Sequence, residues 1–174
     1  MALDVSRREI VQYPDPVLRT VARPVDVIDD AVRAVAARMI ELMHDADGAG
    51  LAAPQVGLSW RMFVTRASED HTDRVHVNPD LVDLGGDMDV RPEGCLSLPG
   101  ITLDIRRPTN AVLTCLDLDG RSITLTATDL EARVWQHELD HINGVLIIDK
   151  MTPMDRIANR RLLKELEVAA GRGP

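Results

Sequence analysis

Gln136-His137-Glu138-Leu139-Asp140-His141 is the stretch of this chain from which its fold and its chemistry can be argued. Two histidines stand four residues apart, and a glutamate directly follows the first. On a helix, residues four apart lie one turn apart on the same face, so both imidazoles can reach a single metal ion. The stretch therefore predicts a helix that carries half of a metal site, with Glu138 placed as a general acid and base.

The neighbouring residues predict that both histidines lie on the buried face of this helix. Thr128, with Glu131 three residues later, is a capping-box pattern for the start of the helix, and Asn143-Gly144 indicates its end. Between them, apolar and histidine side chains recur at spacings of four, three and four, which is one helical stripe. Buried histidines need polar partners, and one metal ion would be a partner to both. The members of the stripe are Leu130, Val134, His137 and His141.

The rest of the pattern predicts an α+β fold, with antiparallel strands packed around the central metal-binding helix. Between Trp60 and Thr126, runs rich in Val, Ile, Leu and Thr alternate with turn residues, and Asp119-Gly120 is a strong hairpin turn. His71 and His76 fall in this region without a close ligand companion. The expected strands are Met62 to Thr65, Val75 to Asn78, Leu81 to Leu84, Ile101 to Ile105, Ala111 to Leu118 and Ser122 to Ala127.

Two further helices are expected, one in the N-terminal half and one at the C-terminus. The first begins near Asp29 and Asp30, whose charges suit a helix N-terminus, and Gly48 lies just past its end. The last follows Pro153 and runs to about Ala170. An irregular arm with a short helical turn at Val17 to Val21 precedes both. The residues of the last helix that can pack inward are Ile157, Leu162, Leu163 and Leu166.

Length and charge limit the classes of function. The 174 residues predict one domain, 1–174, and the net charge of −8 argues against an extended nucleic-acid groove, so no sequence-specific nucleic-acid partner is expected. Residues 1–10 lack the apolar centre of a signal peptide, and no apolar run is long enough for a bilayer. We therefore expect a cytoplasmic protein without a membrane partner. Cys95 and Cys115 are too few for a disulfide framework.

Two further stretches contain residues suited to catalysis. Residues 48–57 are Gly-Ala-Gly-Leu-Ala-Ala-Pro-Gln-Val-Gly, and such small residues let another group approach the backbone closely. A phosphate cradle is not supported, because no Lys-Ser/Thr pair follows. Gln55 has a neutral amide that can donate to a developing oxyanion without taking a place on a metal. Residues 93–100 are Glu-Gly-Cys-Leu-Ser-Leu-Pro-Gly and place Cys95 beside a glycine.

A third metal ligand is needed, because a catalytic metal usually has three protein ligands and an open place for water. A typical zinc peptidase would use a later carboxylate such as Asp149 or Glu165, but neither has a local reason to point inward. Cys95 is therefore the predicted third ligand, whereas Cys115 lies in an alternating strand pattern and is predicted to be a small buried apolar residue. Two imidazoles and a thiolate can hold Zn(II), Fe(II), Co(II) or Ni(II), so the ligand types leave the metal open.

Taken together, these stretches resemble the peptide deformylase family. Gly-Ala-Gly-Leu-Ala-Ala-Pro-Gln at 48–55, Glu-Gly-Cys-Leu-Ser at 93–97 and the stretch at 136–141 are similar to the family's three motifs, in the same order and at the usual spacing. Tyr13-Pro14-Asp15-Pro16-Val17-Leu18-Arg19 also resembles its N-terminal segment. The resemblance covers nearly the full chain, and the three motifs together are highly specific.

The resemblance implies an enzyme that removes the formyl group from N-formylmethionine at the start of new bacterial or organellar polypeptides and releases formate. Glu138 would take a proton from the attacking water and return it to the leaving amine, while the Gln55 side chain and the Leu96 backbone N–H would stabilise the oxyanion. It also implies one divalent metal ion, Fe(II) natively, for which Zn(II), Ni(II) or Co(II) can substitute. The implied ligands are Cys95, His137 and His141.

The same resemblance places the substrate. The peptide is expected to lie extended along the backbone near Gly50, with the methionine side chain in an apolar pocket near Leu130 and Val134. Glu93 and Arg107 resemble a structural ion pair of the family.

Two arginines depart from the family pattern. Arg91 and Arg133 stand near positions where some members place apolar pocket residues, which affects the lining of the pocket and its sequence preference. On the last helix, Arg156, Arg160 and Lys164 form a basic row that fits the family's expected contact with the ribosome, with a solvated face as the alternative.

Two other classes of function compete with the deformylase. One is a metallopeptidase that cuts ordinary amide bonds, and the other is a non-enzymatic metal-binding or regulatory protein. Gln55 and Cys95 argue against the first, because a zinc peptidase needs neither. Glu138 argues against the second.

Overall fold

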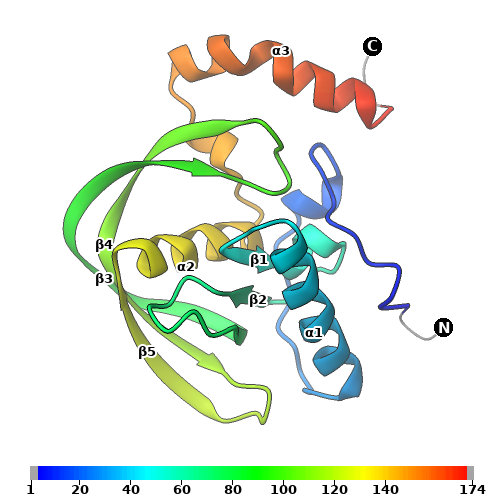
Figure 1. Ribbon diagram of the computed structural model, residues 1–174, viewed down its shortest axis with the longest axis vertical. Coiled ribbons are helices and arrows are strands. Elements are labelled where there is room, and N and C mark those ends of the chain that lie inside the picture. Colours follow the sequence, from blue (N-terminus) through cyan, green and yellow to red (C-terminus); the bar gives the residue numbers. More distant parts are fainter. Residues whose placement is uncertain (1–3, 172–174) are drawn as a thin grey trace.

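In the computed structural model, which describes residues 4–171, a five-stranded antiparallel sheet curves around one helix, α2 (Figure 1). This arrangement confirms the predicted α+β fold with a central helix. Residues 1–3 and 172–174, the ends of the predicted domain 1–174, lie outside the described residues. The strands are β1 (Gly50–Ala52), β2 (Met62–Thr65), β3 (Arg74–Gly94), β4 (Thr102–Leu116) and β5 (Ser122–Thr128). The helices are α1 (Asp30–Asp45), α2 (Asp129–Ile142), α3 (Pro153–Ala169) and the short 3-10 helices η1 (Pro16–Arg19), η2 (Ala53–Val56) and η3 (Ile147–Lys150).

Helix α1 begins at the predicted position. The Asp29 carboxylate accepts a hydrogen bond from the Val32 N–H at 3.0 Å, which satisfies one of the free donors at the helix N-terminus. The apolar face of the helix packs against β1 and β2, next to the glycine-rich stretch. Its buried residues are Val32, Val35, Ala36, Met39, Leu42 and Met43.

Helix α2 begins after Thr128, but the predicted capping box is wrong. The Thr128 side chain makes no capping hydrogen bond with the described residues, and the Glu131 carboxylate faces Arg74, 3.9 Å from its guanidinium. Leu130 is 55% exposed, so the buried stripe begins one turn later than predicted, at Val134. The reason is that Leu130 lines the open side of a cavity rather than the core.

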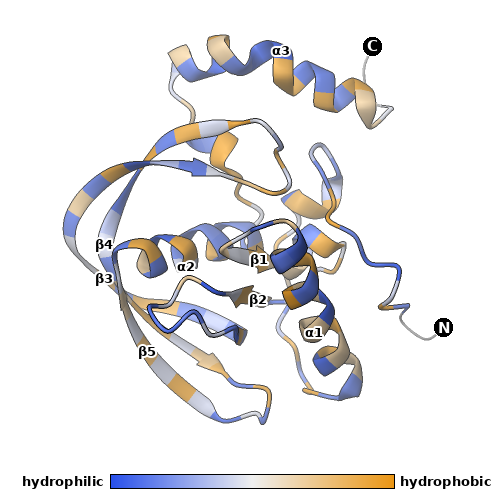
Figure 2. Cartoon of the chain, viewed as in Figure 1, coloured by the Kyte–Doolittle hydropathy of each residue, from blue (hydrophilic) through white to orange (hydrophobic). Residues whose placement is uncertain are grey.

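The predicted short strands of the middle region merge into longer ones. Three register shifts along β3 keep it paired with β4 through residues that look like turns in the sequence. At one of these shifts Asn78 has a φ of 50°, and its side chain hydrogen-bonds to the backbone of Val25. Buried and more exposed residues alternate along most of β4 and along β5, whose colours in Figure 2 change from residue to residue. The predicted segments that merge are 75–78 with 81–84 in β3, and most of 101–105 with most of 111–118 in β4.

Helix α3 lies beyond one end of the sheet (Figure 1), and one side of it packs on the core. Leu162, Leu163 and Leu166 pack as predicted, against the core formed around Leu98. Ile157 does not, because it is 70% exposed on the outer side of the helix. Within the described part of the chain, no helix is long and apolar enough to cross a membrane.

His76, which the sequence places without a close ligand companion, has two polar neighbours in the core. Its fully buried ring lies between Thr65, whose Oγ1 is 3.0 Å from Nε2, and Cys115, whose Sγ is 3.7 Å from Nδ1. Cys115 is buried in the apolar core around Trp135, as predicted. Burial lowers the pKa of His76 to about 3. The histidine is therefore neutral in the folded protein at any moderate pH.

This buried histidine should make the fold sensitive to mild acid. Between pH 6.5 and 3 the unfolded chain binds a proton at His76 that the folded chain does not, so the free energy of unfolding falls as the pH falls. From pH 6.5 to 5 the loss is about 2 kcal/mol, at roughly 1.4 kcal/mol per pH unit. Urea unfolding of the wild type and of His76→Gln at both pH values isolates this contribution. An equal loss in both proteins would contradict the assignment to His76.

Candidate metal centre

The three predicted ligands lie together. His137 and His141 stand one turn apart on α2, and Cys95 lies in the connection between β3 and β4. The two Nε2 atoms are 3.2 Å apart, and the Cys95 Sγ is 3.2 Å from the Nε2 of His141. All three ligand atoms lie within 4.8 Å of one another. The fold thus brings residues more than forty positions apart in the sequence to one point.

This donor set fits one small divalent ion. A tetrahedral ion with bonds of about 2.0–2.1 Å to nitrogen and 2.3 Å to sulfur has donor atoms about 3.3–3.6 Å apart. The measured separations of 3.2 Å are close to these values. Burial lowers the pKa of His141 well below its usual range, so its ring is neutral and can bind a cation. Burial also lowers the pKa of His137, but hydrogen bonds with Cys95 and Glu93 outweigh it and raise the pKa, so a metal would compete with a proton there.

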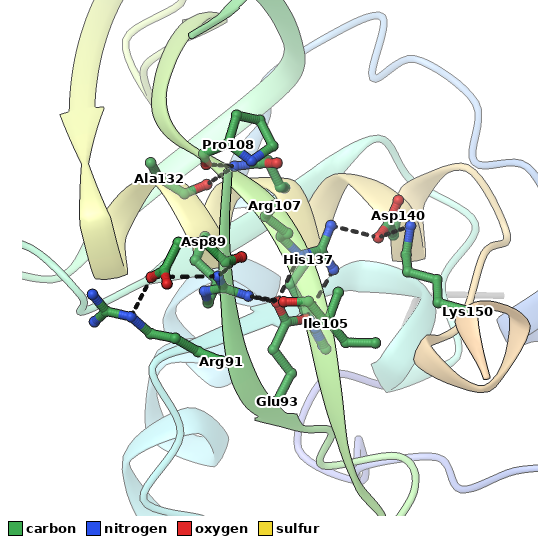
Figure 3. A network of polar contacts seen from close by, with 12 residues as sticks. Asp89, Arg91, Glu93, Ile105, Arg107, Pro108, Ala132, His137, Asp140 and Lys150 are labelled. Carbon is green, nitrogen blue, oxygen red and sulfur yellow. Dashed lines mark hydrogen bonds and ion pairs between the residues drawn. The ribbon is translucent and has the colours of Figure 1, made fainter. Parts of the chain in front are cut away.

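A buried ion-pair network orients His137 (Figure 3). Its Nδ1 donates to the Glu93 Oε2 at 3.2 Å, which leaves Nε2 for the metal site. Arg107 donates to both oxygens of Glu93, from Nε at 2.7 Å and from a terminal nitrogen at 2.9 Å, so the predicted ion pair is confirmed. Burial raises the pKa of Glu93, but hydrogen bonds from His137 and Arg107 outweigh it and lower the pKa to about 2. Glu93 is therefore a stable anion.

The network extends to the other side of the helix. Arg107 also reaches the Asp140 Oδ2 at 2.9 Å, and Lys150 approaches the same oxygen at 3.2 Å (Figure 3). Asp140 belongs to the stretch 136–141, but no pattern in the sequence indicates a role for it. Its partners come from β4 and η3, and only the folded chain brings them to α2.

The two unusual arginines differ in position. Arg133 is buried and lines the cavity at the metal site, as its place in the sequence suggested. Arg91 is exposed, pairs with Asp89 and is not among the described residues that line the cavity. The expectation that both arginines shape the pocket is therefore right for Arg133 and wrong for Arg91.

Glu138 points into the site from α2. It is 3% exposed, and among residues 4–171 no group hydrogen-bonds to its Oε2. Burial, the largest influence, raises the pKa of Glu138 to about 7. Such a carboxyl group can both accept and give up a proton near neutral pH.

Gly50 makes room for this carboxylate. A β-carbon at position 50 would lie 2.5 Å from the Glu138 Oε1 and 2.8 Å from a methyl carbon of Val134. Real side chains do not approach so closely, so a β-carbon at position 50 would force Glu138 or Val134 to move. This contact is the close backbone approach that the small residues of 48–57 predicted.

Two hydrogen-bond donors lie at the edge of the site, the side-chain amide of Gln55 and the backbone N–H of Leu96. The Gln55 Oε1 accepts from the Ala52 N–H at 2.9 Å, which turns its Nε2 towards Ser97 Oγ at 3.2 Å and the Cys95 Sγ at 3.7 Å. The Leu96 N–H has no hydrogen-bond acceptor in the described part of the chain. Gln55 is buried and therefore has a fixed orientation.

A cavity of about 510 Å³ opens over these groups. It is large enough for a peptide end rather than a single small ion. The three predicted substrate-binding residues line it: Gly50, Leu130 and Val134. The three predicted catalytic residues do so too: Gln55, Leu96 and Glu138.

Comparisons with known proteins agree with this geometry. Residues 7–157 match the family model described as polypeptide deformylase. The chain is 43% identical to a peptide deformylase of Stutzerimonas stutzeri and 44% identical to one of Pseudomonas aeruginosa, each over 91% of this chain and 93% of the relative.

Solved structures of the same kind superpose on it. An Arabidopsis thaliana peptide deformylase in complex with an inhibitor matches with a TM-score of 0.87 and 35% identity, over 93% of this chain and 91% of that one. The Thermotoga maritima peptide deformylase matches with a TM-score of 0.80 and 40% identity, over 84% of this chain and 98% of that one. The chain belongs to the polypeptide deformylase family, whose metal-dependent enzymes remove the N-formyl group from nascent peptides.

Proposed function

We propose a role for each residue of the site in the deformylation of nascent peptides. Cys95, His137 and His141 hold one divalent metal ion, which when bound supplies the Lewis acidity that acidifies water and polarises a carbonyl group. The observation that carries the proposal is the meeting of three donor atoms beside the buried Glu138. Glu138 accepts a proton from the attacking water and gives it to the nitrogen of the leaving amine. Water thus adds to the formyl carbon, the C–N bond breaks, and formate and a free amino terminus result.

The oxygen of the formyl group needs donors as negative charge develops on it. The Gln55 Nε2 and the Leu96 N–H are the candidates, because one is held in place by Ala52 and the other is free of any acceptor among the described residues. Both groups line the cavity next to Cys95. A donor fixed before the reaction costs no reorganisation when the charge forms.

The substrate lies extended along the backbone at Gly50. Its methionine side chain rests against Val134 and Leu130. Leu130 is exposed on the cavity wall, where it can contact an apolar side chain of the substrate. Closure of this surface by the substrate would keep bulk water from Glu138.

The metal in the cell is proposed to be Fe(II), with Zn(II), Ni(II) or Co(II) as substitutes. A thiolate and two imidazoles suit all four ions, so the choice among them follows the resemblance to the family. We place the reaction in the cytoplasm, where nascent chains emerge from the ribosome.

The outer face of α3 is proposed to contact the ribosome. Arg156, Arg160 and Lys164 are exposed along one side of a helix that is attached to the body only by its inner side. A basic row of this kind suits RNA phosphates or an acidic protein. Replacing the three residues by alanine should weaken co-sedimentation with ribosomes, and unchanged binding would reject this contact.

The activity itself is tested with protein loaded with Fe(II) under anaerobic conditions. Formate release is measured on formyl-Met-Ala and on its acetylated and unformylated analogues. We expect formate from the formyl peptide and no cleavage of the Met–Ala bond in any of the three. Metal-loaded protein that releases no formate would reject the proposal, and cleavage of the Met–Ala bond would favour the ordinary metallopeptidase instead.

A further inference from the structure

Arg133 and His137 both hydrogen-bond to the Glu93 carboxylate. The two residues stand four apart on α2, so their side chains leave the same face of the helix one turn apart. A terminal nitrogen of Arg133 donates to the Glu93 Oε1 at 2.6 Å, while the His137 Nδ1 donates to Oε2 at 3.2 Å. Glu93 is thus held by two groups from α2 and by Arg107 from β4.

Arg133 also fastens the strand that carries Glu93. It donates to the carbonyl oxygen of Ile105 on β4 at 2.9 Å and to that of Asp89 on β3 at 3.0 Å. Here β3 and β4 pair only with each other among the described strands, because β2 reaches only residues 74–77 of β3, and β5 only residues 110–116 of β4. This end of the ribbon has no neighbouring strand to fix its distance from the helix. Arg133 supplies one tie to the helix, beside the hydrogen bond from Gln136 to the Pro108 carbonyl oxygen at 3.0 Å and the ion pair between Arg107 and Asp140.

From these contacts we infer that Arg133 is a positioning residue for the metal ligand His137. It fixes Glu93 relative to α2, and Glu93 in turn fixes the plane of the His137 ring and keeps Nε2 directed at Cys95 and His141. Arg133 lines the cavity, and its guanidinium hydrogen-bonds to Glu93 and to two carbonyl oxygens. The inference rests on the proposed metal site and extends it to a residue that departs from the family pattern.

If Arg133 acted on metal affinity only through its charge, its effect would be opposite to that of a positioning residue. Arg133 is a cation close to the site of another cation, so its charge alone opposes metal binding. Removing the charge should then tighten binding, whereas removing a positioning residue should weaken it. The direction of the change therefore separates the two roles.

The experiment compares three variants. Arg133→Met keeps most of the stem without the donors, Arg133→Lys keeps the charge without the planar fork, and Arg91→Met removes a nearby charge that does not touch Glu93. Zn(II) affinity is measured by competition with a chromophoric chelator, and the visible spectrum of the Co(II) protein reports the ligand geometry. We expect Arg133→Met to bind Zn(II) about tenfold more weakly, with an altered Co(II) spectrum, as for other groups that orient a ligand.

The controls make the outcomes distinct. Arg133→Lys should lose about threefold in affinity, and Arg91→Met should match the wild type or bind slightly more tightly. Wild-type affinity and spectrum in Arg133→Met would overturn the inference and leave the proposed function intact. If Arg133→Met does not fold, unchanged affinity in Arg133→Lys overturns it. A wild-type protein that binds no metal would overturn both.

Discussion

Glu138→Gln should lower the rate of formate release by about 10²–10⁴-fold while the protein keeps its metal. Glutamine has the size and shape of glutamate but cannot take a proton from water, so the change removes one function with little effect on packing. Glu138 is buried beside the ligands without being one of them, which is why the metal should remain. The expected loss of rate equals the usual contribution of a positioned general acid and base to catalysis.

The measurement is kcat on formyl-Met-Ala together with metal content after dialysis. Cys95→Ala is the complementary control for Glu138→Gln, because it should lose metal while Glu138 stays in place. If Glu138→Gln retained kcat within a factor of about three, another group would have to be the base. Metal retention by Cys95→Ala at wild-type strength would refute its role as a ligand.

Gly50→Ala should fold and bind metal, but its kcat should fall by about 100-fold. The added β-carbon would lie 2.5 Å from the Glu138 Oε1, so the carboxylate must turn away from its present position. A displacement of about 1 Å in a catalytic group can cost a factor of this size. The substrate path along the same backbone would narrow as well.

Gly85→Ala is the control for this change. Its added β-carbon would meet no atom within 4 Å, and Gly85 lies in β3 away from the cavity. Circular dichroism and metal content should match the wild type for both variants, and only Gly50→Ala should lose activity. Equal activity of the two variants would show that Glu138 tolerates the displacement.

The parts of this structure that the sequence predicts well are those set by local geometry. The spacing of His137 and His141 fixes their common face on any helix, and Asp29 begins α1 because a carboxylate caps free N–H groups wherever it stands before a helix. Cys95 could be predicted as the third ligand because the proposed donor set was incomplete without it.

Other parts depend on contacts that no local pattern contains. The turn-like residues within β3 form bulges in a continuous strand only because β4 lies alongside and pairs with the residues around them. Leu130 continues an apolar stripe and is nevertheless exposed, because a cavity opens where a core would otherwise continue. The four-residue spacing of Arg133 from His137 is a sequence signal that both could reach Glu93. The carbonyl groups on β3 and β4 that accept hydrogen bonds from Arg133 come near it only in the folded chain.

The contact between Gly50 and Glu138 also limits the evolutionary paths open to this chain. A residue with a β-carbon at position 50 would push Glu138 or Val134 from its place, so selection for the proposed reaction acts against such a residue, although glycine there performs no chemistry. A lineage that no longer needs the reaction loses this constraint, and position 50 is then free to drift. Glycine at this position in a distant descendant would therefore be a record of continued selection for activity, one that can be checked before any enzyme is purified.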